Sequence, residues 1–265
     1  MRRPVALVTG ASGGIGLALG RELAAGGHDL VLVARSVEKL DQVARELRTQ
    51  FHVDVECCPH DLSDRGSVDT LWREVTTNNR GVDVLVNNAG AGLHGAFSDQ
   101  DVSAIERLIT LNVLSVTVLT KLALPHMLAH RRGRILNVAS LAAYQPGGPR
   151  EAVYYATKAF VLSFTKGLSS ELKGSGVTAT ALCPGPTTTS FDASAGASET
   201  GLYTWMPAMS AAAVARAGYR GMMRGSRVVI PGVPSKLMAF AGELPPRRIA
   251  LEVNRLLLKE GRSST

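Results

Sequence analysis

Residues 9–16 read TGASGGIG; they follow the apolar run VALV at residues 5–8 and precede a helical pattern. This order predicts a strand that leads through a tight turn into the N-terminus of a helix. Glycines at such a turn allow positive φ angles and close backbone approach, and the first N–H groups of the helix attract phosphate. The stretch therefore favours a bound dinucleotide, although its G-x-x-x-G-x-G spacing alone also fits an ordinary glycine turn. The expected contacts are Gly10, Ser12, Gly14, Ile15 and Gly16.

Short apolar runs alternate with helical patterns along most of the chain. Seven runs predict strands, at residues 4–8, 29–34, 53–58, 82–87, 133–139, 177–183 and 227–230. Helical patterns lie between them, at residues 14–25, 37–50, 63–78, 102–131, 152–173 and 211–223. Strict alternation with continuous apolar strands indicates a parallel sheet covered by helices on both faces. We expect an α/β, doubly wound Rossmann-type fold whose functional residues lie at the carboxyl ends of the strands.

Length and composition suggest a single domain over residues 1–265, since no Pro/Ser-rich linker or break in composition divides the chain. No apolar segment of a signal peptide follows Arg2 and Arg3. The apolar stretch Ile109–Ala129 contains polar residues, and we expect a buried helix there rather than a membrane span. Three cysteines on predicted strands fit a reduced, cytoplasmic setting.

The net charge of +7 is concentrated in the C-terminal fifth of the chain. Residues 216–265 contain ten Lys or Arg against three acidic residues, whereas residues 1–215 contain nineteen of each sign. Such a segment suits nucleic acid, anionic lipid or a partner protein, but it also suits a plain solvated face. We expect no nucleic acid as partner and do not favour contact with a membrane surface.

The second predicted strand ends in VLVARS at residues 31–36, about twenty residues after the glycine turn. An acidic residue at this place binds the ribose diol of NAD, whereas a nearby arginine accommodates the 2′-phosphate of NADP. Ala34 cannot bind the diol, whereas the Arg35 guanidinium can donate two parallel hydrogen bonds to a phosphate. Ser36 lies next to Arg35 in the sequence and is expected to contact the cofactor as well. The sequence therefore favours NADP(H), while a surface Arg35 at the start of the next helix is the structural alternative.

Tyr154 and Lys158 are four residues apart on a predicted helix, so they share one face. The pKa of a tyrosine is near 10 in model peptides, and a neighbouring ammonium favours the phenolate. The pair therefore predicts a proton donor and acceptor usable near neutrality. Ser140 ends the preceding strand, where its hydroxyl would face the same cleft.

On these motifs the sequence resembles the short-chain dehydrogenase/reductase family from about Pro4 to at least Ile230, and within it the NADP-preferring carbonyl reductases and hydroxysteroid dehydrogenase relatives. The matching motifs occur in order. They are TGxxxGxG at 9–16, Asp61-Leu62, NNAG at 87–90, Asn112, Ser140, Tyr154-x-x-x-Lys158, and Pro184-Gly185 with Thr189. One departure is that Ser140 and Tyr154 are fourteen residues apart, about one more than is usual, and the turn at residues 145–150 can absorb the difference.

The resemblance implies a role for each matching residue. Tyr154 would be the general acid in reduction and the base in oxidation, while Lys158 would lower the pKa of Tyr154 and bind the nicotinamide ribose. Ser140 would hold the substrate oxygen, and Asn112 would anchor a water in a proton relay. The other implied cofactor contacts are Asp61 and Leu62 at the adenine, Asn88, Ala89 and Gly90 along the adenosine side, Pro184 and Gly185, and Thr189 at the carboxamide.

The substrate is expected to be a small hydrophobic carbonyl compound or alcohol. Residues 187–210 would form a lid, and the apolar residues expected over the nicotinamide are Phe191, Leu202, Tyr203, Trp205, Met206 and Met209. The other expected wall residues are Leu93, His94, Phe97, Leu141 and Tyr144. Residues 234–260 predict two short basic amphipathic helices that pack inward against the body or a second subunit of a homo-oligomer. No metal is expected, because the six histidines lack ligand spacing.

These observations favour an NADP(H)-dependent carbonyl reductase or alcohol dehydrogenase. The alternative from another class is a cofactor-sensing or interaction protein of the same fold without significant turnover. Loss of Tyr154 or Lys158 would favour that alternative, but both are present.

Overall fold

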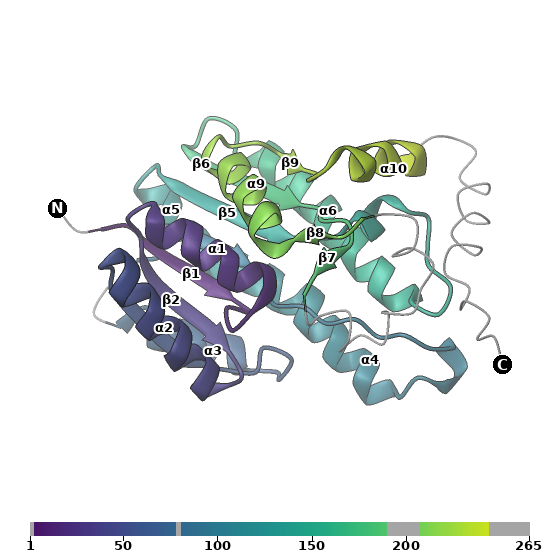
Figure 1. Ribbon diagram of the computed structural model, residues 1–265, viewed down its shortest axis with the longest axis horizontal. Helices are drawn as coiled ribbons and strands as arrows, with labels where there is room; N and C mark the ends of the chain where they lie inside the picture. The colour runs from purple at the N-terminus through teal and green to yellow at the C-terminus, as the bar shows by residue number, and fades with distance from the viewer. Residues whose placement is uncertain (1–2, 78–80, 190–206, 244–265) are drawn as a thin grey trace.

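The computed structural model describes residues 3–77, 81–189 and 207–243 (Figure 1). Its main feature is a seven-stranded parallel sheet in the order β3-β2-β1-β4-β5-β6-β9. The strands are β1 Val5–Thr9, β2 Asp29–Ala34, β3 Val55–Pro59, β4 Val84–Asn87, β5 Gly133–Val138, β6 Val177–Leu182 and β9 Val228–Val229. Each strand coincides with a predicted apolar run to within two residues, so the expected doubly wound fold is confirmed.

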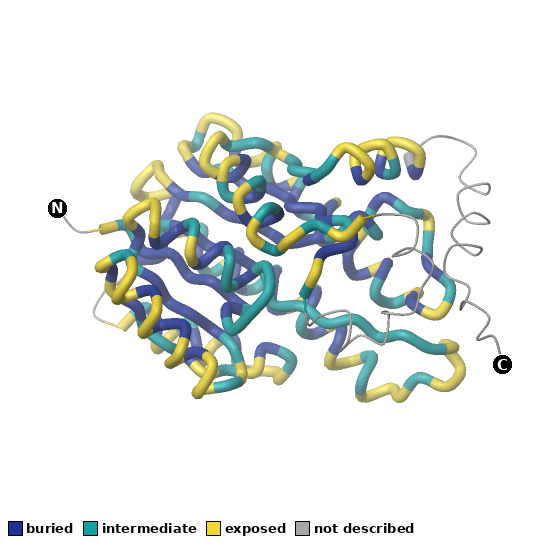
Figure 2. The backbone as a smooth tube through the Cα atoms, viewed as in Figure 1, coloured by how far each residue is buried: buried dark blue, intermediate teal, exposed yellow. Residues whose placement is uncertain are grey.

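Helices cover both faces of this sheet. On one face, α1 (Gly14–Ala25), α2 (Val37–Phe51) and α9 (Ala211–Met223) bury their apolar sides against the strands. On the other face, α3 (Ser67–Val75), α5 (Ser115–Ala129) and α6 (Ala152–Glu171) do the same. In Figure 2 the strands are therefore coloured as buried, and the outer sides of the helices as exposed. The core is therefore two apolar layers separated by the sheet.

The predicted helix over residues 102–131 is divided in the structure. It consists of α4 (Val102–Ile109), a π-helical turn η3 (Thr110–Leu114) and α5, which ends at Ala129. By length and composition the run Val102–Ala129 could cross a membrane. Here, however, α5 packs in the core against β4 and β5, which agrees with the expectation of a buried helix.

The helix predicted from residue 63 begins at Ser67 instead, because the preceding Gly66 has a φ of +89° and interrupts the helical backbone. A second sheet was not predicted. It pairs β7 (Thr187–Thr188) with β8 (Met209–Ser210) and so joins the two ends of the expected lid. Met209 packs against the apolar core that includes residues of α1 and α9, and it is not among the residues that line the cavity described below. The other predicted lid residues lie at 190–206, outside the described residues.

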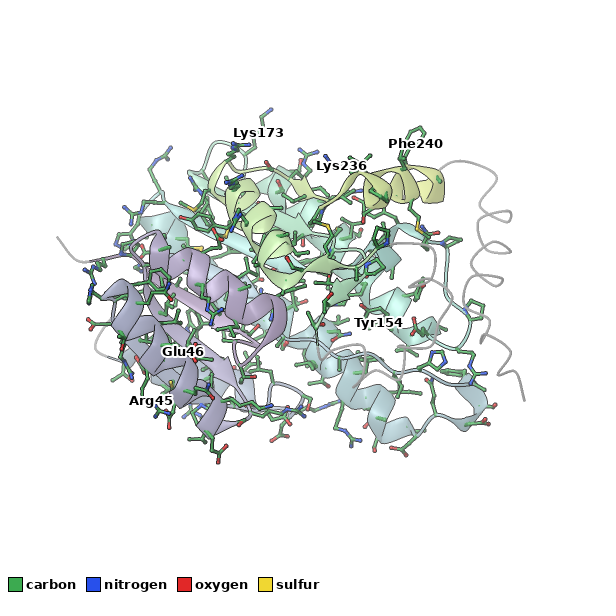
Figure 3. The ribbon with its side chains drawn as sticks, in the orientation of Figure 1. Arg45, Glu46, Tyr154, Lys173, Lys236 and Phe240 are labelled. Carbon is green, nitrogen blue, oxygen red and sulfur yellow. The ribbon has the colours of Figure 1, made fainter. Side chains whose placement is uncertain are left out.

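The C-terminal segment begins as predicted with a helix, α10 (Val233–Glu243). Ala239 is buried, but Leu237 and Phe240 are about two-thirds exposed, at 66% and 64%. The helix therefore packs against the body on one side only, and packing of its other side against a second subunit stays a prediction. Lys236 and Phe240 both project from the outer side of α10 in Figure 3. The expected second helix lies at residues 244–260, outside the described residues.

Candidate active site

A cavity of about 1060 Å³ lies beyond the carboxyl ends of the strands. β1 stands between β2 and β4, so the strand order reverses there and opens a crevice between the loops that follow β1 and β4. Most of the residues expected from the sequence line this one cavity. They are Gly10, Ser12, Gly14, Ile15, Arg35, Ser36, Asp61, Leu62, Asn88, Ala89, Gly90, Ser140, Tyr154, Lys158, Pro184, Gly185 and Thr189.

The glycine turn explains why glycines occupy its key positions. Gly10 and Gly14 have φ angles of +65° and +54°. A Cβ atom on Gly16 would lie 2.2 Å from the carbonyl oxygen of Gly10 and 2.4 Å from Nδ2 of Asn88, so Gly16 lies behind the cavity wall and lets α1 approach the turn. The Asn88 side chain fixes this turn by donating a hydrogen bond to the carbonyl oxygen of Thr9 at 2.9 Å.

The start of α1 fits a pyrophosphate. Its N-cap, Gly13, provides no side-chain hydrogen bond to the first turn, and a Cβ on Gly13 would meet no atom within 4 Å. Open space therefore lies in front of uncapped N–H groups, which is the arrangement that binds phosphate at a helix N-terminus. Thr189 closes the other side, with Cγ2 3.2 Å from where a Cβ on Gly14 would be.

Tyr154 and Lys158 lie on α6 at the opposite end of the cavity. Lys158 Nζ is 5.8 Å from the centroid of the Tyr154 ring and donates a hydrogen bond to the carbonyl oxygen of Val138 at 3.0 Å. Lys158 is only 5% exposed, and burial lowers the pKa of its ammonium to about 8.

At the Tyr154 end of the cavity, Ser140 is part of the wall and Asn112 is not. Ser140 lines the cavity, and its Oγ accepts a hydrogen bond from the N–H of Ala142 at 3.1 Å. Asn112 lies behind the wall in the π-helical turn η3. Its Nδ2 donates to the carbonyl oxygen of Ala91 at 2.9 Å and to Thr157 Oγ1 at 3.1 Å, and its Oδ1 accepts from the N–H of Ala91 at 3.0 Å. The amide therefore joins the loop after β4 to α6.

Positive charge gathers at the adenosine end. Besides Arg35, the cavity is lined there by Lys39 from α2 and Arg107 from α4, neither of which was predicted. Although burial alone would raise the pKa of the Asp61 carboxyl, hydrogen bonds from Ser63 and the charges of Arg35 and Arg107 lower it overall. Ser36 also has a local role, because its Oγ accepts a hydrogen bond from the N–H of Lys39 and caps α2.

The walls near Tyr154 differ in part from the prediction. Leu93 and Leu141 line the cavity as expected. The other three are not among the lining residues. His94 pairs with the wall residue Glu151, Phe97 is 64% exposed, and Tyr144 is buried in a core cluster. The wall residues that were not predicted include Gln145, Glu151, Tyr155 and Met238. Burial raises the pKa of Tyr155 far above that of an ordinary phenol, so Tyr155 is poorly suited to proton transfer.

A separate group of potential metal ligands lies between β3 and α3. Glu56, Cys58 and Glu74 have ligand atoms within 4.8 Å of one another. Within the group, the Cys58 thiol donates to Glu56 Oε1 at 3.9 Å. Glu74 pairs in addition with a residue outside the group, since its Oε2 lies 2.8 Å from His60 Nε2.

A comparison with known protein families identifies the family of this chain. Residues 4–200 match the family model described as short chain dehydrogenase. The chain belongs to the short-chain dehydrogenase family. A granaticin polyketide synthase putative ketoacyl reductase of Streptomyces violaceoruber is 42% identical over 186 residues, which cover 69% of this chain and 67% of that relative.

Two solved structures extend the likeness to nearly the whole chain. A short-chain dehydrogenase from Sphingobium yanoikuyae in complex with NADPH is 32% identical, with a TM-score of 0.80 over 99% of this chain and 98% of that one. A bulky-bulky ketone specific alcohol dehydrogenase from Comamonas testosteroni is 28% identical, with a TM-score of 0.76 over 100% and 98%. Short-chain dehydrogenases act on alcohol and carbonyl groups, and this protein is an NAD(P)-dependent oxidoreductase of that family.

Proposed function

We propose that the protein interconverts a hydrophobic ketone or aldehyde and its alcohol with NADP(H), using Tyr154 as the proton donor and acceptor. The observation that carries the proposal is the convergence of Tyr154, Lys158 and Ser140 in the cavity that also contains the uncapped N-terminus of α1. One cavity thus provides both an anion site for a dinucleotide and a proton-transfer group. A binding protein without turnover would not need a buried lysine beside a tyrosine.

The chemistry assigned to the side chains follows from their placement. When bound, the nicotinamide supplies or accepts the hydride at the carbonyl carbon. In the reductive direction Tyr154 Oη donates a proton to the substrate oxygen, while Ser140 Oγ donates a hydrogen bond to the same oxygen. The Lys158 ammonium stabilises the phenolate that remains, and Val138 holds that ammonium in place. Asn112 positions the loop and helix around them.

Three cations support a preference for NADP(H). Arg35 directly follows β2, Lys39 lies in the first turn of α2, and Arg107 lines the same cavity from α4. In this fold the 2′-phosphate of the cofactor is placed next to the end of β2. Ala34 offers no side-chain acceptor for a ribose diol. A solved relative in complex with NADPH supports the same preference.

The substrate class is inferred from the wall near Tyr154. Leu93, Leu141 and Met238 provide an apolar surface there, and such a surface favours a hydrophobic carbonyl compound over a sugar. The likeness to a ketone-specific alcohol dehydrogenase from Comamonas testosteroni supports a ketone.

The experiment is an NADPH-oxidation screen over aliphatic, aromatic and steroid ketones, followed at 340 nm. We expect turnover with at least one hydrophobic ketone and weaker turnover with NADH. If no carbonyl compound is reduced although NADPH binds tightly, the protein is a cofactor-binding protein and the proposal is overturned.

A further inference from the structure

Two segments that are far apart in the chain meet in the cavity wall beside Ser140. Ser140 leads directly into a short 3-10 helix, η4 (Leu141–Tyr144), and the wall residue Gln145 follows it. The other segment is α10, which contributes Met238, 93 residues after Gln145. Met238 packs against the apolar cluster that contains Leu141. The position of α10 relative to η4 therefore decides where Met238 lies in the wall.

η4 is held in place by contacts that do not involve α10. Ser140 Oγ accepts a hydrogen bond from the N–H of Ala142 at 3.1 Å. The N–H of Leu141 donates to the carbonyl oxygen of Pro184, just after β6, at 2.7 Å. These bonds tie η4 to the carboxyl ends of the strands. Of the two segments, α10 is therefore the one whose position can change while Ser140 stays in place.

α10 approaches η4 very closely because its inner side carries small residues. Ser235, Ala239 and Gly242 are buried and follow one another at helical spacing, so they share the inner side of the helix. A Cβ on Gly242 would lie 2.3 Å from the carbonyl oxygen of Tyr144, a distance that real Cβ atoms do not show. A glycine at residue 242 is therefore required for α10 to lie where it does.

Gln145 fastens α10 at the residue that lines the cavity. Its Nε2 donates a hydrogen bond to the backbone carbonyl oxygen of Met238 at 3.3 Å. A carbonyl oxygen has two acceptor positions, so this bond adds to the hydrogen bond of the helix itself. A Cβ on Gly242 would lie 3.0 Å from the same Nε2. Gly242 therefore also leaves the space in which the Gln145 amide reaches α10.

Helix propensity does not explain Gly242. In a helix interior glycine is less favourable than alanine by about 0.8–1 kcal/mol, so the helix alone would favour alanine here. What glycine provides is the close contact with η4. Ordinary contact begins at 3.4 Å, so an added methyl group has to move α10 away from η4 by about 1 Å. Met238 would move with the helix, and the cavity would widen at this point.

We propose that Gly242 and Gln145 are positioning residues that set the substrate specificity: they hold α10 on η4, and Met238 then limits the size of the ketone. This inference rests on the proposed function and narrows its substrate class to ketones whose substituent on the α10 side is small. Gly242 itself is not among the residues that line the cavity, so its effect on specificity has to pass through α10.

Three ketones test the size limit. They are acetophenone, isobutyrophenone, in which an isopropyl group replaces the methyl, and 2-acetonaphthone, in which a naphthyl group replaces the phenyl. We expect the wild type to reduce acetophenone and to disfavour at least one larger ketone in kcat/KM by about tenfold or more. Met238→Ala should raise the ratio of that larger ketone to acetophenone by about 10- to 100-fold, the range for small changes of volume in a hydrophobic pocket.

Gly242→Ala should raise the same ratio for the same ketone by about 3- to 30-fold, because Met238 moves away but is still present. If Gly242 acts through Met238, the double variant Met238→Ala/Gly242→Ala should have the ratio of Met238→Ala alone. Gln145→Met removes the donor at similar length and should shift the ratio in the same direction. Gly167→Ala is the matched control, since Gly167 is exposed on α6 and an added Cβ there meets no atom within 4 Å.

Melting temperature and the Kd for NADPH check the fold of each variant, and neither should change enough to explain a shift in the ratio. If Gly242→Ala does not fold, Gln145→Met and its double variant with Met238→Ala make the same comparison. A shift in Met238→Ala alone, or shifts that add in the double variant, would overturn the inference, because the docking of α10 would then not set the limit.

The wild type provides the remaining outcomes. An enzyme that reduces all three ketones equally well, or that reduces other ketones but not acetophenone, overturns this inference and leaves the proposed function intact. A protein that binds NADPH but reduces no ketone overturns both.

Discussion

Arg35→Ala should weaken NADPH binding much more than NADH binding. For the unmodified protein we expect NADPH to bind more tightly than NADH by about 2–4 kcal/mol, the scale of charge-assisted hydrogen bonds to a phosphate. Arg35 is exposed and shares the adenosine end with Lys39 and Arg107. Its removal should therefore cost about 1.5–3 kcal/mol, or roughly 10- to 100-fold in the Kd for NADPH. The double variant Arg35→Ala/Lys39→Ala should nearly equalise the two cofactors.

The assay is the Kd of each cofactor, measured by nicotinamide fluorescence or calorimetry at one fixed salt concentration, because exposed charges are screened. Arg45→Ala is the matched control. Arg45 is an exposed arginine on α2, labelled in Figure 3, and it does not line the cavity. Equal Kd values for NADPH and NADH in the unmodified protein would refute the assignment. So would a loss in Arg45→Ala as large as that in Arg35→Ala.

Three further predictions concern Lys158, the glycine turn and the C-terminal segment. Burial lowers the pKa of Lys158 to about 8, so its ammonium is lost above that pH; ketone reduction should therefore fall at alkaline pH in the wild type, and this alkaline decrease should be absent in Lys158→Met. Between about pH 8 and 10.5 Lys158 is protonated in the unfolded chain but not in the folded one, so this group makes the fold more stable as the pH rises through that range. Gly16→Ala places a Cβ 2.2 Å from the carbonyl oxygen of Gly10 and should lower the free energy of unfolding by about 1–3 kcal/mol in denaturant titrations. Gly20→Ala is the control: its Cβ would have its nearest contact at 3.8 Å, so this substitution should be neutral or stabilising. Deleting residues 243–265 should lower the melting temperature or dissociate an oligomer in light scattering, and the full chain should not float with anionic vesicles; floating, together with an unchanged mass and melting temperature after deletion, would point to the membrane instead.

The sequence was sufficient for the sheet because parallel strands buried on both faces are continuous apolar runs. It was also sufficient for the glycine turn and for Tyr154 with Lys158, since their spacing is local. The π-helical turn at Asn112 was not predictable, because it depends on hydrogen bonds from this side chain to Ala91 and Thr157, far away in the chain.

Residues brought in by tertiary packing were missed for the same reason. Lys39 could have been found, since it lies four residues after Arg35 in the first turn of the next helix. Arg107 and Glu151 could not have been found from the sequence, because their place in the cavity depends on how α4 and the loop after β4 lie against α6. Phe97 and Tyr144 were assigned to the wall by hydrophobicity alone, which does not distinguish an exposed ring from a core ring.

The most direct test of the account compares Tyr154→Phe with Tyr155→Phe in NADPH-dependent ketone reduction. The two tyrosines are adjacent, but only Tyr154 has Lys158 four residues further along the helix. Tyr154→Phe should lower kcat by at least about 10²-fold with little change in the Kd for NADPH, because it removes only the proton donor. Tyr155→Phe should have a mild effect. A Tyr154→Phe enzyme that keeps its turnover while Tyr155→Phe loses it would contradict the assignment of the proton-transfer residue.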